Sequence, residues 1–274
     1  MRKNQYICAK IKKKIVKKEI LVTNDDSIDA QGVKVLAQML TKYGHVTVVA
    51  PAEPQSGKST SLSMEKPLYL KKIKENDDMS VYSFSGTPAD CIKIAMNTFF
   101  SLENKPDYIL SGINHGTNAT AAVIYSGTIG AVKEGTILEI PSMGFSIDNG
   151  EEEIDFTALK YYGDKILRKF FSKPPTPGTY LNVNFPNICD INRIKGIKIA
   201  HQGKGRWVRE FTKMKDSHGQ DYYWMKGNFQ NLDDDYDRAD HLLVDEGYIA
   251  IVPHKLDCTN YEEMNKLQND WGLE

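Results

Sequence analysis

ILVTNDDSIDAQGVKVLAQMLTKYGHVTVVA, residues 20–50, is the stretch that decides the fold. It begins within an apolar run, Glu19 to Thr23, that stops at a polar loop, which is the pattern of a buried strand. Apolar residues at helical spacing follow from Gly32 to Tyr43, with Gly44 where a C-terminal cap is expected. Val46 to Ala50 is a second strand. A strand, a helix and a strand in about 30 residues predict a βαβ unit with parallel strands and a right-handed crossover.

The alternation of strands and helices continues to residue 171. The segment Thr87–Asp90 combines a capping Thr, a Pro at the first helical position and an acid in the first turn, so it predicts a helix start. The expected elements, in chain order, are a hairpin that leaves the main sheet (67–73 and 79–84), a helix to about 100, a parallel strand (107–111), a small-residue helix from 128, a short strand (141–146) and a helix (154–171). This order predicts an α/β fold with a parallel sheet.

The pattern changes after the Pro-rich segment at residues 174–178. Residues 181–185 and 197–200 still indicate sheet, whereas 204–227 form aromatic, turn-broken extended segments that lead into an acidic tract at 233–240. Residues 242–252 read as one more hairpin-like pair, and Tyr261 to Trp271 as a closing helix. We therefore expect β-hairpins to decorate the α/β part, with a boundary near 175–200.

Composition excludes several classes of protein. The 274 residues carry a formal net charge of -1, with 41% hydrophobic and 26% charged residues, so there is no overall basic field for a nucleic-acid polymer. The four cysteines are far apart and are expected to be reduced thiols of a cytosolic protein. No stretch is long and apolar enough for a membrane span. The basic start, residues 1–18, lacks a signal-peptide core, and a solvated extension is favoured over a weakly amphipathic helix with Ile7, Ile11 and Ile15 on one face.

Three polar loops follow strands of the expected sheet: Asn24–Ser27, Gln55–Thr60 and Asn114–Asn118. In an open parallel sheet, ligands bind beyond the C-terminal ends of the strands. These loops are therefore expected to converge on one edge, although up to about 90 residues separate them in sequence. That convergence is the main argument for a functional site here.

The residue types in these loops suit a hard divalent cation. Asp25 and Asp26 would repel each other without a cation, and Ser56 and Asn114 add hydroxyl and amide oxygens. Taken singly, each motif is better explained without a metal: Asn-Asp-Asp as a capped Asx-turn, and Ser56 and Asn114 as turn residues.

Other segments allow two interpretations. Ser126-Gly127-Thr128 precedes a helix and is either an anion cradle or an ordinary N-cap. The cluster Lys204, Arg206, Trp207 and Arg209 is either a site for a phosphorylated or aromatic ligand or a solvated hairpin. His115 and His254 could approach the site, with a structural histidine as the default. A dinucleotide site is disfavoured because the turn after the first strand lacks Gly-x-Gly-x-x-Gly.

Five ordered blocks, ILVTNDDSIDAQG, VVAPAEPQSGKSTSLS, SGTPADCIK, SGINHGTNATAAVIYSGTIGAVKEG and VDEGYIAIVP, resemble the survival protein E family (SurE), the 5′/3′-nucleotidases. The resemblance runs from about residue 19 to 255. It implies a Rossmann-like three-layer parallel-sheet domain with a C-terminal β-hairpin region, about 200–255, that exchanges between subunits to give a homodimer or homotetramer. Residues 1–18 would be a basic extension and 256–274 a C-terminal helix.

The resemblance also implies a chemistry. Nucleoside monophosphates would be dephosphorylated with one divalent cation per subunit, Mg²⁺ or Mn²⁺, bound by Asp25, Asp26, Ser56 and Asn114, while Asn118, Ser126, Gly127 and Thr128 contact phosphate. We expect direct in-line hydrolysis, with Asp25 orienting or deprotonating the water; an aspartyl-phosphate route is the alternative. A non-catalytic nucleotide-binding or sensor module is the rival function, and an NAD(P) oxidoreductase a weaker one.

Two departures from the family pattern bear on these expectations. The family usually has Gly after Asn-Asp-Asp, where this chain has Ser27; if the position needs a positive φ, Ser costs roughly 1 kcal/mol or more. Family members also commonly carry acids shortly before the YSGT block, where this chain has Asn-Ala-Thr-Ala-Ala-Val. The second departure puts substrate preference in question and leaves the metal ligands intact.

Overall fold

The computed structural model describes residues 17–148, 154–234 and 238–272. Within these ranges a nine-stranded sheet has the order β3-β4-β2-β1-β5-β6-β7-β13-β8. β1 pairs in parallel with β2 and β5, β2 with β4, β5 with β6, and β6 with β7. The bounds are β1 Lys18–Thr23, β2 Gly44–Pro51, β3 Leu70–Glu75, β4 Met79–Phe84, β5 Tyr108–His115, β6 Ser142–Ile147, β7 Thr179–Phe185, β8 Gly196–Ile199 and β13 Tyr248–Lys255.

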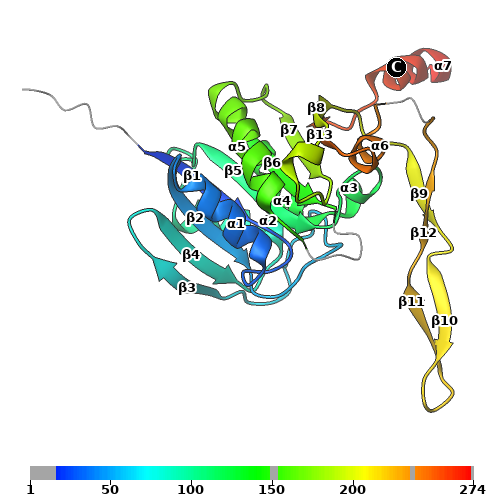
Figure 1. Cartoon of the computed structure of the whole chain (residues 1–274). Helices are drawn as coiled ribbons and strands as arrows, with labels where there is room; N and C mark the ends of the chain where they lie inside the picture. The colour runs from blue at the N-terminus through cyan, green and yellow to red at the C-terminus, as the bar shows by residue number, and fades with distance from the viewer. Residues whose placement is uncertain (1–16, 149–153, 235–237, 273–274) are drawn as a thin grey trace, which may run out of the picture.

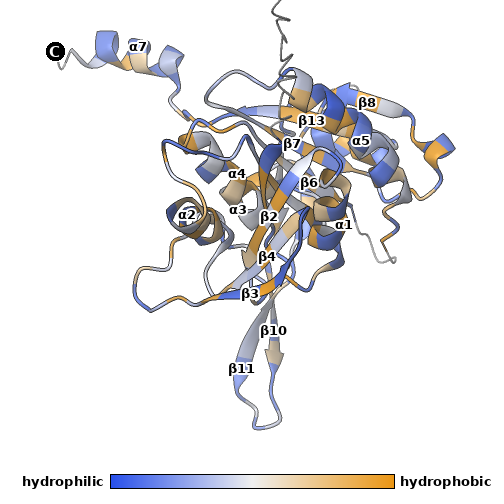
Figure 2. Cartoon of the chain, turned by 90° about the vertical axis from the view of Figure 1, so that its left-hand side faces the viewer, coloured by the Kyte–Doolittle hydropathy of each residue, from blue (hydrophilic) through white to orange (hydrophobic). Residues whose placement is uncertain are grey.

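Helices cover both faces of this sheet (Figures 1 and 2). α1 (Gln31–Leu40) and α5 (Thr157–Ser172) share one apolar core with the strands, and α2 (Pro88–Thr98) and α4 (Gly127–Ile137) lie over the other face. The result is the predicted three-layer α/β fold with a mostly parallel sheet. The predicted capping box is also present: Thr87 accepts from the Asp90 N–H, and Asp90 accepts from the Thr87 N–H.

β1 lies at the point where strand order reverses. From β1 the chain builds β2 and β4 on one side of the sheet and then crosses over to build β5, β6 and β7 on the other. In open α/β sheets this reversal opens a crevice at the C-terminal ends of the two central strands, here β1 and β5. The fold therefore directs attention to the loops after residues 23 and 115.

Two predictions about the first half were wrong in detail. Gly44 does not cap α1; it begins β2, and a Cβ there would lie 2.1 Å from the Lys18 carbonyl oxygen, so glycine is required by the close approach to β1. The β3–β4 hairpin does not leave the sheet. β4 pairs in parallel with β2, and β3 forms the sheet edge; Tyr82 and Phe84 are buried on one face of β4, and Met79 and Val81 are partly buried on the other.

The prediction of a hairpin-like pair at residues 242–252 was also wrong. The segment forms a short helix, α6 (Asp240–Asp245), followed by β13, which enters the main sheet between β7 and β8. Leu243 and Val244 have strand-forming neighbours in sequence, yet they pack as a helix against β13. The closing helix α7 (Tyr261–Trp271) has the predicted limits and buries none of its residues.

Residues 205–231 form a long hairpin, here called the arm, that projects from the body (Figure 1). It consists of β9 (Gly205–Val208) paired with β12 (Asn228–Asn231), continued by β10 (Phe211–Lys215) paired with β11 (Asp221–Met225). Aromatic and Met side chains are exposed along it: Trp207, Phe211, Met214, Tyr222, Tyr223, Trp224, Met225 and Phe229.

The remaining described elements are short: α3 (Ala122–Tyr125) and the 3₁₀ turn Ile191–Arg193. Among the helices of the described ranges, none combines the length and the apolarity of a membrane span. Residues 1–16, where an extension was expected, lie outside the described part of the chain.

Candidate active site

The loops after β1, β2 and β5 meet at the crevice. The Gln55 N–H donates to the Asp25 carbonyl (2.7 Å), and the His115 N–H donates to Asp26 Oδ2 (3.0 Å). Together with α3, α4 and the arm they surround a cavity of about 290 Å³. Its lining includes Asp25, Ser56, Gly57, Asn114, His115, Gly116, Thr117, Asn118, Ala122, Tyr125, Ser126 and Trp207. The predicted convergence of distant polar loops is therefore present in the structure.

Asp25 is almost fully buried and is held by the start of α4. The Thr128 hydroxyl donates a short hydrogen bond to Asp25 Oδ1, and the Thr128 backbone also hydrogen-bonds this carboxyl group. Burial raises the pKa of Asp25 to about 6, with the Asp26 charge adding to the rise and the Thr128 bonds opposing it. Burial thus disfavours the ionised form of Asp25, and the hydrogen bonds from Thr128 offset part of that cost.

The same contact explains Gly127. A Cβ at this position would lie 2.8 Å from the Asp25 Cβ, so only glycine lets the helix start approach the acid. Ser126 caps α4 by accepting from the Ile129 N–H (3.1 Å). Of the two interpretations of this segment, the N-cap is present, and the Asp25 carboxylate also lies at this positive end of the helix.

Asp26 lies beside Asp25 and is less buried. Burial raises its pKa, opposed by the hydrogen bond from the His115 N–H and by the His115 charge. Two adjacent carboxyl groups with raised pKa values form a site that gains from a bound cation, because the cation removes their mutual repulsion and part of the burial cost.

Asn114 is positioned by an irregularity in β5. The register with β6 shifts between Ser111 and Asn114, and Gly112 within it has φ +125°, with no room for a Cβ against the Phe145 carbonyl. The side-chain NH₂ of Asn114 donates to the Gly116 carbonyl (2.6 Å), which leaves Oδ1 on the site side, 3.5 Å from Thr128 Oγ1. A bulge that re-aims a polar side chain is a frequent device at functional sites.

Ser56 is exposed and sits on a turn in which Gly57 has φ +74°. The loop is fastened to α3 by Ser59, whose N–H donates to the Tyr125 carbonyl (3.0 Å) and whose hydroxyl donates to the Ile124 carbonyl (2.7 Å). Ser56 therefore faces the cavity from a tethered loop.

Asn118 is buried in an amide network that the sequence analysis missed. Its N–H donates to Asn184 Oδ1 (2.8 Å), its side-chain NH₂ to Ser146 Oγ (2.7 Å), and its carbonyl accepts from the Asn182 side chain (2.9 Å). The signal was visible in LNVNF, where two asparagines alternate within an apolar strand; such a pattern indicates buried amides that need polar partners.

Asp240 was also missed. Its carboxylate is fully buried and accepts from three backbone N–H groups, those of Thr120 (3.2 Å), Gly203 (3.0 Å) and His241 (2.9 Å). Burial raises its pKa, and these three bonds oppose the rise. Asp240 thus joins the loop after Asn118 to the base of the arm.

Ser27 has φ +88°, which confirms that this position requires a positive φ. The loop keeps its shape through neighbouring bonds: the Asn24 NH₂ donates to the Ser27 carbonyl (2.8 Å), and the Ile28 N–H to the Pro51 carbonyl (2.8 Å). Ser therefore occupies a conformation that glycine adopts at lower cost.

The histidines and the basic cluster named in the sequence analysis differ in whether they line the cavity. His115 lines the cavity, whereas His254 is stacked on Tyr180, with ring centroids 5.2 Å apart, outside the cavity lining. Of the cluster at residues 204–209, Trp207 lines the cavity, while Arg206 donates to Gln230 across the arm (3.0 Å).

The donor set fits a divalent cation. Asp25, Asp26, Ser56 and Asn114 offer oxygen atoms, the ligands that Mg²⁺ and Mn²⁺ prefer, and both acids have raised pKa values. With two acids and no histidine nitrogen in the set, it differs from a zinc site; in the described ranges there is no group of three or more His, Cys, Asp or Glu suited to a metal.

Comparison with known proteins gives a consistent result. A family model described as survival protein SurE matches residues 20–209. The 5′-nucleotidase SurE of Flavobacterium johnsoniae is 42% identical over 255 residues, 93% of this chain and 96% of that protein. That of Chlorobaculum tepidum is 39% identical over 258 residues, 94% and 96% respectively. A crystal structure of the SurE protein from Aquifex aeolicus superposes with a TM-score of 0.78 at 35% identity, over 92% of this chain and 98% of that one.

Proposed function

The chain belongs to the survival protein SurE family and is a 5′-nucleotidase, and from this premise we propose which of its residues carry the hydrolysis of nucleoside monophosphates. The single observation that supports the assignment is the meeting of Asp25, Asp26 and Asn114 at the ends of β1 and β5. The rival, a non-catalytic nucleotide sensor, is not favoured, because the curated relatives are 5′-nucleotidases.

Asp25, Asp26, Ser56 and Asn114 would hold one divalent cation per subunit, Mg²⁺ or Mn²⁺. A cation bound there would supply positive charge against the negative charge that develops on the phosphate. Their oxygen atoms suit such an ion, and the raised pKa values of the two acids give it a reason to bind.

Asp25 orients the attacking water and accepts a proton from it. Its carboxylate is fixed by Thr128, so its free lone pairs point into the cavity in one direction. Because the Thr128 hydroxyl and backbone both bond Asp25, we assign Thr128 a positioning role for this acid. Its expected phosphate contact stays a prediction. A phospho-enzyme trapped by rapid quenching would instead favour Asp25 or Asp26 as a nucleophile.

The phosphate then contacts Asn118, Ser126 and Gly127. Ser126 and Asn118 line the cavity, and Gly127 provides the N–H at the positive end of α4. In-line phosphoryl transfer requires mainly positioning and stabilisation of charge on the equatorial oxygens, which these groups supply.

The base of the nucleotide lies between Trp207 and Tyr125. Both rings line the cavity and both are more than 40% exposed, so they offer free faces for stacking. Trp207 comes from the arm and Tyr125 from α3, so the substrate spans the junction of arm and body. Trp207 would thus make the arm part of the substrate site.

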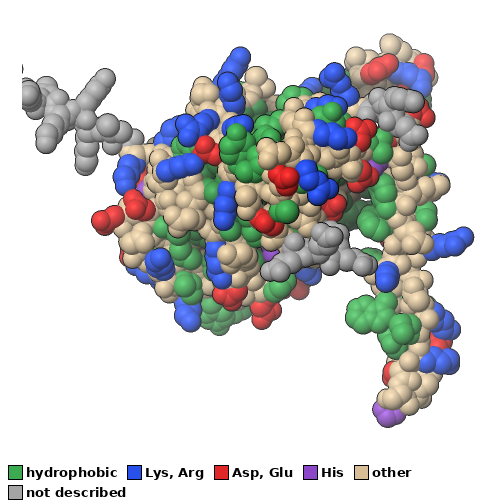
Figure 3. All heavy atoms as spheres, viewed as in Figure 1, with side chains coloured by type: hydrophobic (Ala, Val, Ile, Leu, Met, Phe, Trp, Pro, Cys, Tyr) green, Lys and Arg blue, Asp and Glu red, His purple; other side chains and the backbone are tan. Residues whose placement is uncertain are grey.

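The arm also supports assembly. Its exposed aromatic side chains form an apolar patch on a projecting hairpin (Figure 3), which is the composition of a protein interface. We assign it to a homodimer or homotetramer. The activity needs neither a nucleic-acid polymer nor a membrane, and we place the protein in the cytoplasm.

A phosphate-release screen tests the function. Purified protein is given AMP, GMP and 3′-AMP with Mg²⁺ or Mn²⁺, and Asp26→Asn is assayed in parallel. We expect release with the wild type, its loss in EDTA and its loss in the variant. Release that survives both EDTA and Asp26→Asn would remove the cation site from the proposal, and no release with any nucleotide would refute the catalytic assignment of these residues.

A further inference from the structure

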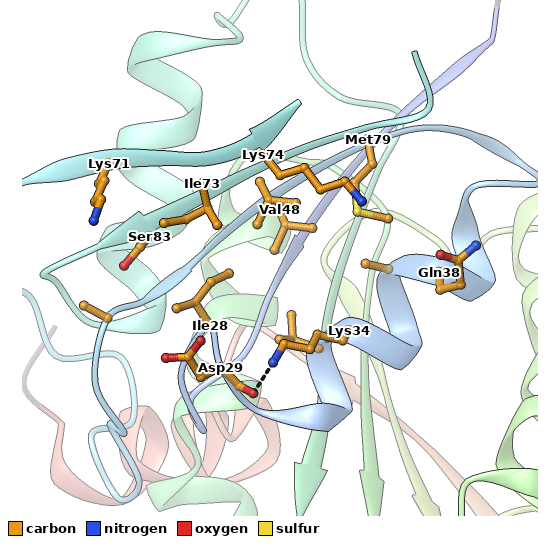
Figure 4. Close-up of a pocket in the computed structure, with 14 residues that line it drawn as sticks. Ile28, Asp29, Lys34, Gln38, Val48, Lys71, Ile73, Lys74, Met79 and Ser83 are labelled. Carbon is orange, nitrogen blue, oxygen red and sulfur yellow. Dashed lines mark hydrogen bonds between the residues drawn. The ribbon is translucent and has the colours of Figure 1, made fainter. Parts of the chain in front are cut away.

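A second cavity lies on the α1 face of the sheet, remote from the arm. It is a groove of about 550 Å³ between α1 and the edge strands β4 and β3. α1 packs on β1, β2 and β5, and the groove opens where β4 and β3 extend beyond the helix. Figure 4 shows the side chains that line it: Ile28, Asp29, Val33, Lys34, Ala37, Gln38, Val48, Ala52, Lys71, Ile73, Lys74, Met79, Val81 and Ser83.

The floor of the groove is apolar and the rim is basic. Val48, Ile73 and Val81 form the apolar floor of the lining. Lys34, Lys71 and Lys74 add ammonium groups around it (Figure 4), and Asp29 is the one acid in the lining. A ligand with an apolar body and a negatively charged group would complement this groove.

The start of α1 strengthens the preference for an anion. The helix has no side-chain cap and no acid in its first turn, and Lys34 lies close to this positive end. The Lys34 ammonium donates to the Asp29 carbonyl oxygen (2.6 Å), so the charge stays beside the helix start. The positive charge of Lys34 beside the positive end of a helix is unfavourable, and a bound anion would offset this repulsion.

A β-bulge builds the basic wall. The register of β3 against β4 shifts between Lys72 and Lys74, so Lys71, Ile73 and Lys74 all line the groove. Lys72 is outside the lining and pairs with Glu75 (2.7 Å). In a regular strand Lys74 would face the side opposite Lys71. The chain therefore presents two lysines where regular pairing would present one.

The groove and the active site share two loops. Ile28 and Asp29 follow directly after the loop of Asp25 and Asp26, and Ala52 begins the loop that carries Ser56. The two loops are joined by the hydrogen bond from the Ile28 N–H to the Pro51 carbonyl. A molecule seated against Ile28 and Ala52 would thus bear on both loops that supply cation ligands.

We propose that this groove is a second ligand site, which binds a phosphorylated heterocycle of nucleotide size, and that its occupancy changes the affinity of the cation site. The volume is in the range of small-molecule sites, roughly 300–1,000 Å³. The open aliphatic floor takes a planar ring, Ser83 and Gln38 offer hydrogen bonds to ring heteroatoms, and the lysines take the phosphate. Ligand binding in the groove does not depend on the proposed function. The effect of that binding on cation affinity rests on the proposed cation site.

The first experiment measures binding of α,β-methylene ADP by calorimetry in EDTA, without a metal. The variant Lys71→Gln/Lys74→Gln is compared with Lys72→Gln, a lysine of the same strand outside the groove, and with Val81→Phe, which fills the floor. We expect about tenfold weaker binding in the double variant and in Val81→Phe, and wild-type binding in Lys72→Gln. Equal binding by all four proteins would overturn the site, and lysine-dependent binding of octanoate in place of the nucleotide would overturn the ligand class.

The second experiment measures the Mn²⁺ dissociation constant by electron paramagnetic resonance, with and without saturating α,β-methylene ADP. We expect the nucleotide to shift it about threefold more in the wild type than in Lys71→Gln/Lys74→Gln, with equal Mn²⁺ binding by both proteins alone. An equal shift in both would overturn the coupling. Absence of Mn²⁺ binding by the wild type would refute the proposed cation site instead, and would leave the binding result of the first experiment unaffected.

Discussion

The candidate active site at the ends of β1, β2 and β5, here called the strand-end site, differs from the arm in how its side chains are buried and held. At the strand ends, Asp25, Asn118 and Thr128 are almost completely buried, and each is held by hydrogen bonds from segments distant in sequence. Along the arm, Tyr223 and Trp224 are 59% and 62% exposed and are held mainly by the ladder of a two-stranded hairpin. The first region buries its polar side chains within the body; the second leaves apolar surface exposed.

The difference teaches where chemistry and assembly are specified. A carboxylate that must act on one atom needs fixed partners, so it lies where several strands end. The proposed interface with another chain needs exposed aromatic area, which the projecting hairpin supplies. Trp207 lines the cavity from the arm, and Asp240 joins Thr120 to Gly203 at the base of the arm.

The largest expected effect is on the acid of the strand-end site. Asp25→Asn should lower kcat/KM for AMP by about 10³-fold, because it removes the proposed proton acceptor and a proposed cation ligand together. Thr128→Val should cost about 30-fold, since it leaves Asp25 in place without its hydroxyl partner. Steady-state phosphate release measures both.

Asp29→Asn is the matched control, an acid four residues further along that lines the other groove. Its basal activity should equal that of the wild type. A loss in Asp29→Asn as large as in Asp25→Asn would mean that the loop, and not the Asp25 carboxylate, is what the substitution disturbs.

Substitutions on the arm are expected to weaken self-association more than they lower activity. Tyr223→Ser/Trp224→Ser is expected to weaken self-association by about 100-fold, because exposed aromatic anchors dominate interface energies. Light scattering over a dilution series measures it, with Lys213→Ser on the same hairpin as control. Unchanged mass at every concentration would remove the arm from the interface.

The body should also be sensitive to acid through His254. Burial, with the Lys133 charge, lowers the pKa of His254 from 6.5 to about 4. The unfolded chain therefore binds more protons than the folded one between these values, so this stability is present above pH 6.5 and is lost as the pH falls towards 4. We expect a loss of about 2 kcal/mol from this group.

Urea unfolding at pH 7 and pH 4.5 measures the loss, and His254→Phe, which keeps a ring against Tyr180, should reduce it. An identical pH dependence in the variant would show that other groups dominate.

At the junction of the two regions, Trp207→Ala should raise KM for AMP by about tenfold, since a lost stacking face is worth ~1.4 kcal/mol. The kcat should change little, because Trp207 is proposed to touch the base and not the phosphate. Glycerol phosphate, which has no ring, should show no change in KM. A fall in kcat with both substrates would instead mean that Trp207 supports the site's structure.

The smallest expected effect is a gain. Ser27→Gly relieves a positive φ and should add about 1 kcal/mol of stability, or roughly 3 °C in Tm. Ser27→Ala, which keeps a Cβ, should give no gain. Calorimetric melting distinguishes them, and equal melting temperatures in all three proteins would mean that the loop bears no strain at this residue.

Local chemistry was enough to predict much of this molecule. The capping box at Thr87, the limits of α7 and the strand before Asn24 each follow from a few adjacent residues. The convergence of the loops at Asp25, Ser56 and Asn114 followed from one topological rule about parallel sheets. Their assignment as cation ligands remains a proposal.

The parts that were missed depend on distant partners. The three N–H groups that Asp240 satisfies include those of Thr120 and Gly203, 120 and 37 residues away, so the acid looked like one more member of a solvated acidic tract. Similarly, the role of Gly44 is set by the Lys18 carbonyl. Tertiary contact overrides the local signal in both cases, which is why a cap and a hairpin were predicted where a strand start and a helix occur.

Gly127 has a further consequence for how sequence variation in this protein is read. It bears no functional group, yet a methyl group on it would collide with Asp25. In a saturation mutagenesis library this glycine would rank beside Asp25, although its proposed phosphate contact is made by the backbone N–H, which every substitution except proline retains. Its intolerance comes from the space that the acid occupies, so an inactive variant at residue 127 reports a displaced neighbour.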